Sequence, residues 1–129
     1  MTIVNEDRRP GEFVLSEAEH GRSRDNIVIA SGSGVIEPGM VLGRFTSGAN
    51  EGKYAPSLNA AADPDVGQQV AVAVALYGCD ATEADATIAG LTRAAQVKGH
   101  SLSYDASVDD ANKVAAKATQ LRAAGIVVR

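Results

Sequence analysis

Val70-Ala71-Val72-Ala73-Val74-Ala75-Leu76-Tyr77 alternates large and small apolar side chains. Because successive side chains of a β-strand point to opposite faces, the valines of this stretch line one face and the alanines the other. The alternation predicts a β-strand, and its alanine face suits close approach by another layer of structure. The stretch is too short to cross a bilayer as a helix, which needs about 20 apolar residues.

Shorter strand signals, separated by turn residues, precede this stretch. Residues 26–30 and 41–45 are rich in Val, Ile and Leu and predict strands. Between them, Pro38-Gly39 predicts a type II turn in which Gly39 takes a positive φ. Residues 53–56 are expected to return as the hairpin partner of residues 41–45.

Beyond the Val–Ala stretch, residues 87–97 carry signals for both helix and strand. Residues 87–97 are rich in Ala, which favours a helix, but Gly90 and an alternation of polar and apolar residues favour a strand, which is our prediction. Residues 102–104 predict a short strand.

One helix is predicted near the end of the sequence. Ser107-Val108-Asp109-Asp110 resembles a capping box and predicts the helix start. Val114, Ala118 and Leu121 then share one face, with Lys113, Lys117 and Gln120 outside that trio. Gly125 is expected to end the helix, and residues 126–128 form a closing strand.

The first twenty-five residues differ from the rest in being polar and charged almost throughout. We expect residues 1–25 to be a flexible N-terminal arm and residues 26–129 to be a β-rich body. Within the arm only Phe13-Val14-Leu15 has strand character, with Phe13 and Leu15 expected on the same side. Such a patch is typical of segments that add a strand to a partner. The alternative is that it folds back on a sheet edge of the body.

Composition and charge exclude several classes of function. The chain has 129 residues, which fits one domain, and its net charge is −4. Its Lys and Arg residues are scattered, so nucleic-acid binding is not expected. Cys79 is the only cysteine, so no intrachain disulfide can form, and we expect a buried or half-buried thiol. The first residues show no signal-peptide pattern, and no membrane association is expected.

No residue pattern predicts catalysis, a cofactor or a metal. His20 and His100 lie far apart and are expected on the solvated surface. Asp80, Glu83 and Asp85 lack the spacing of a calcium loop. No nucleophile is paired with a base, so we expect no catalytic residue, no bound cofactor, no metal site and no enzyme activity.

The order of three stretches resembles the phage head decoration protein family. The first is Glu12-Phe13-Val14-Leu15-Ser16-Glu17. The second comprises residues 27–32, 36–43 and 53–56, and the third is residues 121–129. Together they span nearly the whole chain, and the length and the C-terminal helix and strand are closer to prophage members than to the lambda protein.

The resemblance implies a fold and a function. The fold is mainly β with a small α part: a β-clip-like bent ribbon or incomplete barrel, a C-terminal helix and a closing strand. The function is structural, in the virion. Homotrimers, made in the host cytoplasm, bind the outer surface of the expanded capsid at three-fold and quasi-three-fold positions. There they brace the major capsid protein against DNA pressure. The resemblance further implies that the arm pairs with capsid strands, and its residues are Glu12, Phe13, Val14, Leu15 and Ser16.

Two other classes of function stay open from the residues. One is a non-viral β-rich adaptor or ligand-binding module, such as a carbohydrate-binding domain, although the chain has no Trp to stack on a sugar ring. The other is a small enzyme, which the missing base and nucleophile disfavour.

Overall fold

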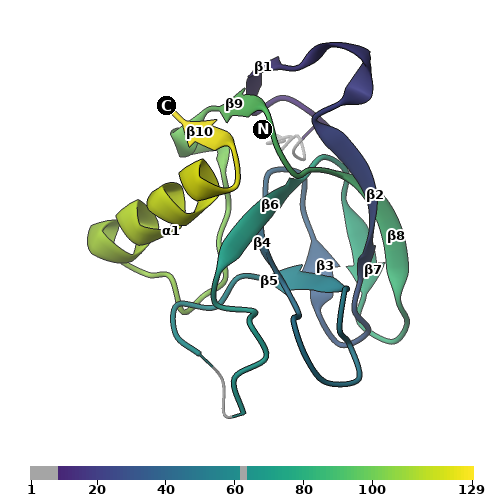
Figure 1. The fold of residues 1–129 in the computed structure, drawn as a ribbon. Helices are drawn as coiled ribbons and strands as arrows, with labels where there is room; N and C mark the ends of the chain where they lie inside the picture. The colour runs from purple at the N-terminus through teal and green to yellow at the C-terminus, as the bar shows by residue number, and fades with distance from the viewer. Residues whose placement is uncertain (1–8, 62–63) are drawn as a thin grey trace, which may run out of the picture.

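A computed structural model describes residues 9–61 and 64–129 of the chain. The described part is mainly β, with one C-terminal helix, as predicted (Figure 1). Its elements, in chain order, are β1 (Val14–Glu17), the 3-10 turn η1 (Glu19–Gly21), β2 (Arg24–Ile29), β3 (Gly34–Ile36), β4 (Val41–Arg44), β5 (Tyr54–Pro56), β6 (Ala71–Ala75), β7 (Cys79–Ala81), β8 (Ala86–Leu91), β9 (Ala95–Val97), the 3-10 turn η2 (Gly99–Ser101), α1 (Ala111–Ala123) and β10 (Ile126–Val128).

Five strands form a ring in the order β2-β5-β4-β6-β8. The β4–β5 pair is the antiparallel hairpin that the sequence predicts. The ring closes weakly between β2 and β5, which are parallel and share only the pair Ile29 and Tyr54. One further hydrogen bond supports this closure, from the Ala30 N–H to the Tyr54 carbonyl over 2.9 Å. The expected mainly β body with an incomplete barrel is thus confirmed, with a seam at β2–β5.

The alternating strand β6 separates two hydrophobic cores. Ala73 and Ala75 face the inside of the ring, among Ile27, Ile29 and Leu42. Val74 faces the other way, into the core that lies between the ring and α1. Ala71, however, belongs to the same core as Val74, and Val72 packs against the inside of the ring, so the predicted separation of alanines and valines onto opposite faces holds only over Ala73, Val74 and Ala75.

Two smaller sheets flank the ring. β3 and β7 form an antiparallel ribbon, and neither strand was predicted from the sequence. The other sheet has the order β1-β9-β10 and joins strands from both ends of the described chain. The predicted strand over residues 87–97 is two strands, β8 and β9, in two different sheets. The predicted strand over residues 102–104 is only a single bridge between Met40 and Ser103.

The helix α1 begins later than its sequence signal suggests. Its N-cap is Asp110, whose carboxylate accepts the Lys113 N–H over 2.9 Å. Ser107 instead bonds Asp105 over 2.6 Å, because Ser and Asp side chains compete for local turn partners. The predicted end is confirmed, since Gly125 has a φ of 90°.

The buried face of α1 includes a lysine that the sequence placed outside it. Lys117 and Leu121 are its buried residues. The Lys117 Nζ donates over 2.6 Å to the carbonyls of Leu58 and Gln69 and over 3.0 Å to the Ser57 hydroxyl. Burial lowers the pKa of this amine, and the charge of Asp105 opposes that shift. The amine thus fastens the loop between β5 and β6 to the helix.

The N-terminal segment differs from the expected arm where the structure describes it. Residues 1–8 lie outside the described residues. β1 pairs with β9, and Phe13 just before it is fully buried. Phe13 is the largest apolar side chain of the segment, so its burial offsets much of the entropy lost on ordering. The structure therefore has the fold-back arrangement that the sequence left open.

In the described part of the chain, no helix has the length and apolar character that crossing a bilayer requires.

Candidate functional site

The β1-β9-β10 sheet is the candidate functional site because it contains the predicted Phe13 patch. β9 lies in the middle, antiparallel to β1 and parallel to β10. β1 and β10 are therefore both edge strands. Figure 1 shows the sheet at one end of the molecule, above the ring and beside the C-terminal end of α1. An edge strand presents unpaired backbone N–H and C=O groups to a partner.

Phe13 anchors β1 to the body. Its side chain has no exposed area and belongs to the same core as Leu121 of α1 and Ile126 of β10. Its carbonyl accepts the Lys98 N–H over 2.8 Å. Loss of this anchor would expose the core under the sheet, so Phe13 has a structural role in the free chain.

A bulge in β1 turns Leu15 outward. Val14 pairs with Val97, whereas Ser16 pairs with Gln96, so one extra residue lies on the β1 side. The extra residue breaks the alternation of side chains along the strand. Leu15 is 48% exposed while Phe13 is buried, so the expectation that the two share one side is wrong.

The five residues predicted to bind the capsid thus divide by exposure. Phe13 is buried and Val14 is half-buried against the same core. Glu12, Leu15 and Ser16 are exposed. Leu15 and Ser16 belong to the edge strand β1, and Glu12 lies in the turn just before it.

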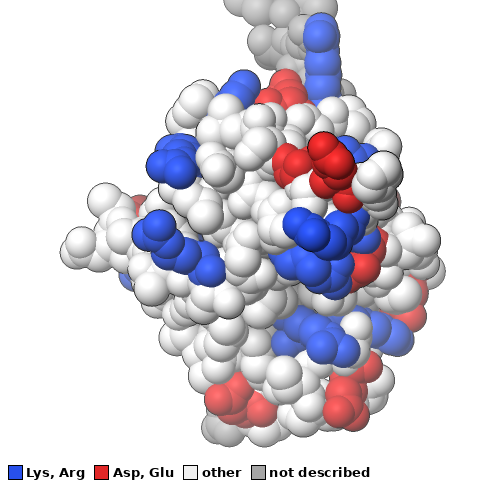
Figure 2. All heavy atoms as spheres, turned by 45° about the horizontal axis from the view of Figure 1, so that its top comes forward, with Lys and Arg blue, Asp and Glu red and all other residues white. Residues whose placement is uncertain are grey.

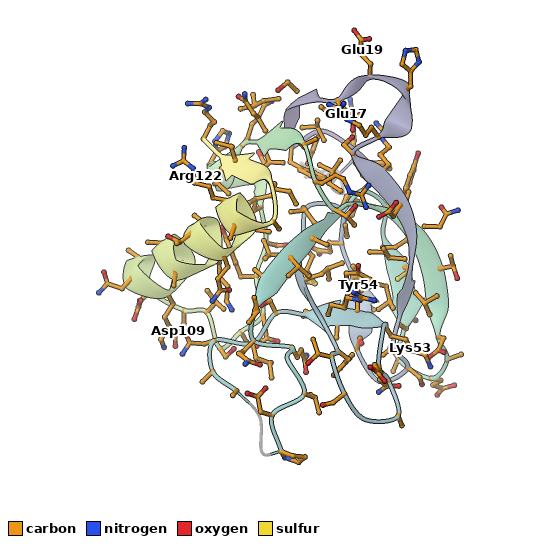
Figure 3. The ribbon with its side chains drawn as sticks, in the orientation of Figure 1. Glu17, Glu19, Lys53, Tyr54, Asp109 and Arg122 are labelled. Carbon is orange, nitrogen blue, oxygen red and sulfur yellow. The ribbon has the colours of Figure 1, made fainter. Side chains whose placement is uncertain are left out.

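Glu17 fixes the end of β1 to the start of β2, and the sequence did not single it out. Its carboxylate accepts from the Ser23 hydroxyl over 2.9 Å and from the Arg24 Nε over 3.0 Å. The hydrogen bond from Arg24 is the main cause that holds the pKa of Glu17 below its ordinary value, and partial burial opposes it. Figure 3 shows Glu17 turned toward the ring, while Glu19 points outward.

A second ion pair joins β2 to the turn before β9. Asp25 accepts from Arg93 and, over 2.8 Å, from the Thr92 hydroxyl. The hydrogen bond from Arg93 is the largest cause that lowers the pKa of Asp25, and the hydrogen bond from Thr92 is the second. In the same turn Ala94 has a φ of 50°, a strained value for a residue with a Cβ. The Ala94 carbonyl accepts the Ala18 N–H over 3.0 Å, so β1 is held at both ends.

The other edge of the sheet lies beside α1. A groove of about 260 Å³ is lined by residues of α1 and β10. Sequence reasoning did not find it, because helix and strand meet there through tertiary packing, in which Leu121 and Ile126 belong to one core. Its lining residues are Ala118, Thr119, Arg122, Val127 and Val128.

Outside this sheet, the acidic side chains and the cysteine that could take part in chemistry have structural roles. Asp80 accepts from Thr82, and Asp85 pairs with Lys53 over 2.8 Å. Burial, followed by the charge of Asp80, raises the pKa of the half-buried Cys79 thiol, which disfavours a reactive thiolate. Within residues 9–61 and 64–129, no group of three or more His, Cys, Asp or Glu side chains could hold a metal ion.

Comparison with known proteins connects this fold to one family. No curated protein matches the chain. The model of a family described as bacteriophage lambda head decoration protein D matches residues 3–126. The match covers nearly all of the 129 residues, including every strand of the sheet apart from the end of β10. The chain therefore belongs to the bacteriophage lambda head decoration protein D family.

Proposed function

We propose that this chain decorates the outer surface of an expanded phage head as a homotrimer. Its family is one of structural capsid decoration proteins and not of enzymes, which supports a role in the virion. In this proposal, trimers sit at three-fold and quasi-three-fold positions. They brace the major capsid protein against the pressure of packaged DNA. The chain is made in the host cytoplasm and assembles onto the shell from there.

The exposed edge of β1 is the observation that carries the proposed mode of binding. A strand of the major capsid protein adds to this edge and continues the β1-β9-β10 sheet. Leu15, which is 48% exposed, supplies an apolar contact, and Glu12 and Ser16 flank it. Phe13 and Val14 hold β1 in place from beneath. The protein thus offers a preformed edge, and β1 need not be ordered at the moment of binding.

A preformed edge reduces the cost of binding. A strand of four residues gives about two to four main-chain hydrogen bonds, each worth about 1 kcal/mol net. Ordering a free arm would cost about 1–2 kcal/mol per residue in backbone entropy. Because β1 is already paired with β9 in the free chain, much of this entropy is lost during folding and does not weaken binding to the capsid.

Three linked edges raise the avidity of one weak contact. A trimer that engages three neighbouring sites binds about 10²–10⁴ times more tightly than one protomer, because the second and third contacts are intramolecular. Stable attachment to the capsid therefore requires both trimerisation and strand addition.

Co-sedimentation with expanded, undecorated shells of the cognate major capsid protein tests this mode of binding. Leu15→Ser should weaken binding by about tenfold or more per trimer, because three apolar contacts are lost together. Val35→Ser is the matched control, since Val35 is 65% exposed on the β3–β7 ribbon. Light scattering should show both variants as trimers. Normal binding of a trimeric Leu15→Ser variant would contradict a role for the β1 edge.

A further inference from the structure

The β1-β9-β10 sheet has a second free edge, on β10. The Ala95 N–H donates to the Gly125 carbonyl over 3.3 Å, and the Arg129 N–H donates to the Val97 carbonyl over 2.9 Å. Residues 125 and 129 therefore direct their backbone groups toward β9. Alternate residues of a strand direct these groups to opposite sides, so those of Val128 point away from β9. Val128 is half-buried, and within the described residues no further strand pairs with β10 on this side.

The groove of about 260 Å³ beside this edge has an apolar floor and a basic rim. Ala118, Val127 and Val128 supply the apolar surface, which has room for one or two small side chains. Arg122 lines the groove from the last turn of α1. Figure 3 shows Arg122 next to β10, with Asp109 at the opposite end of the helix.

The bases near this edge lack acidic partners. Lys98, Arg122 and Arg129 form no ion pair with any residue in the described ranges. The Arg129 Nε donates to the amide oxygen of Gln96 over 3.1 Å. By contrast, Arg24 and Arg93 near β1 are paired with Glu17 and Asp25. Figure 2 looks onto this end and shows blue groups without adjoining red ones on the α1 and β10 side, whereas blue and red adjoin on the other side.

A role in helix stability accounts for only part of this pattern. A cation in the last turn of a helix is favoured by the helix dipole, which explains Arg122 alone. Lys98 follows β9 and Arg129 follows β10, so neither belongs to the helix. Three unpaired bases from three elements therefore create a local positive field on a chain whose net charge is −4.

We propose that the β10 edge and its groove bind an extended, acidic segment of the major capsid protein, separate from the strand that adds to β1. The inference rests on the proposed decoration function. The segment's backbone pairs with Val128, a small apolar side chain enters the groove, and its carboxylates meet Arg122, Arg129 and Lys98. With both edges in use, one protomer connects two capsid segments through a single sheet. Such a cross-link is a direct way to brace a shell.

Two variants separate this edge from the rest of the protein. Arg122→Glu reverses the charge at the groove without touching the core, because Arg122 is exposed. Val128→Pro removes one outward N–H and leaves the bonds of β10 to β9 in place, as Pro is tolerated on edge strands. The control for charge is Arg44→Glu, at an exposed residue of the ring.

Binding of the full chain to expanded, undecorated cognate shells is measured by co-sedimentation, with circular dichroism and light scattering to confirm folded trimers. Arg122→Glu and Val128→Pro should each weaken binding by about tenfold or more, while Arg44→Glu binds like the parent. Raising the salt concentration to about 0.5 M should weaken the binding of the parent chain to the shells, since salt screens exposed charges. The binding of Arg122→Glu should change much less.

The outcomes distinguish this inference from the function on which it rests. If the parent chain fails to bind expanded shells, the decoration function itself is wrong. If the parent binds and folded trimers of Arg122→Glu and Val128→Pro bind equally well, the β10 edge has no capsid partner. Equal weakening by Arg44→Glu would also overturn the inference, because net charge alone would then explain the effect.

Discussion

Gly43 occupies a position in the ring that has no room for a Cβ. A Cβ at this position would lie 2.0 Å from the Gln68 carbonyl oxygen and 3.1 Å from that of Val70. The register of β4 against β6 also shifts between Leu42 and Gly43. The absence of a side chain therefore permits the backbone of the loop before β6 to cross β4 closely.

Gly43→Ala should lower the free energy of unfolding by about 3 kcal/mol, because backbone atoms must move to relieve the clash. Gly90→Ala is the control, since its Cβ would meet the far end of the Ile27 side chain, at 2.7 Å from Cδ1, which can rotate. Urea denaturation of both variants measures the difference. A loss for Gly43→Ala no larger than that for Gly90→Ala would contradict the account.

Lys117 is the second residue with a specific prediction. Lys117→Met keeps the length of the apolar stem but leaves the buried carbonyls of Leu58 and Gln69 without their donor. We expect a loss of about 1–3 kcal/mol in thermal or urea unfolding. Lys113→Met, which removes only an ion pair with Asp109, should cost less than about 0.5 kcal/mol. Equal losses for the two variants would show that the hydrogen bonds of Lys117 do not contribute to the free energy of unfolding.

Among the elements, β1 depends on ionised carboxylates at its junction with β2. The pKa of Glu17 is lower in the folded chain than its ordinary value, and so is that of Asp25. A lowered folded pKa means that the unfolded chain binds more protons. The stabilisation of the folded chain by these two carboxylates is therefore complete at a pH above their pKa in the unfolded chain. It is lost as the pH falls through their lower pKa in the folded chain.

Acid should accordingly destabilise the β1–β2 junction. The melting temperature should fall between about pH 5 and pH 3, and Glu17→Gln should flatten part of this fall because its side chain does not titrate. Glu19→Gln, at a side chain that is 92% exposed, should leave the curve unchanged. The check is a series of thermal melts across this range, and identical curves for Glu17→Gln and the parent would refute the role of Glu17.

The elements differ in how far the sequence determines them. The strand β6 was predictable because its Val–Ala alternation is local, and the end of α1 was predictable because Gly125 permits a positive φ. Lys117 lies three residues after Val114 and four before Leu121, so helical periodicity places it on the buried face, and only its charge led to the prediction that it lies outside. Four oxygen acceptors, from distant segments and from its own helix, stabilise the amine there.

The same limit applies to the candidate site. The strand character of Phe13-Val14-Leu15 was visible in the sequence, but its partner was not, because β9 lies about eighty residues further along the chain. The outward turn of Leu15 depends on a bulge, which no local pattern signals. The groove beside β10 likewise arises only from tertiary packing.

At the scale of the whole molecule, the proposal requires a trimer. In light scattering, the chain should have a mass about three times 13.2 kDa at micromolar concentration. The reason is that one edge contact is too weak for stable decoration without multivalency. A monomer at all concentrations would favour the alternative of a non-viral adaptor or ligand-binding module.

Decoration of an expanded head is the central claim, and cryo-electron microscopy of cognate shells mixed with this protein tests it most directly. The account predicts three-lobed density on the outer surface at the three-fold and quasi-three-fold positions. In that density, the β1 edge should be continuous with a strand of the major capsid protein. Shells that retain bare three-fold positions at saturating protein would contradict it.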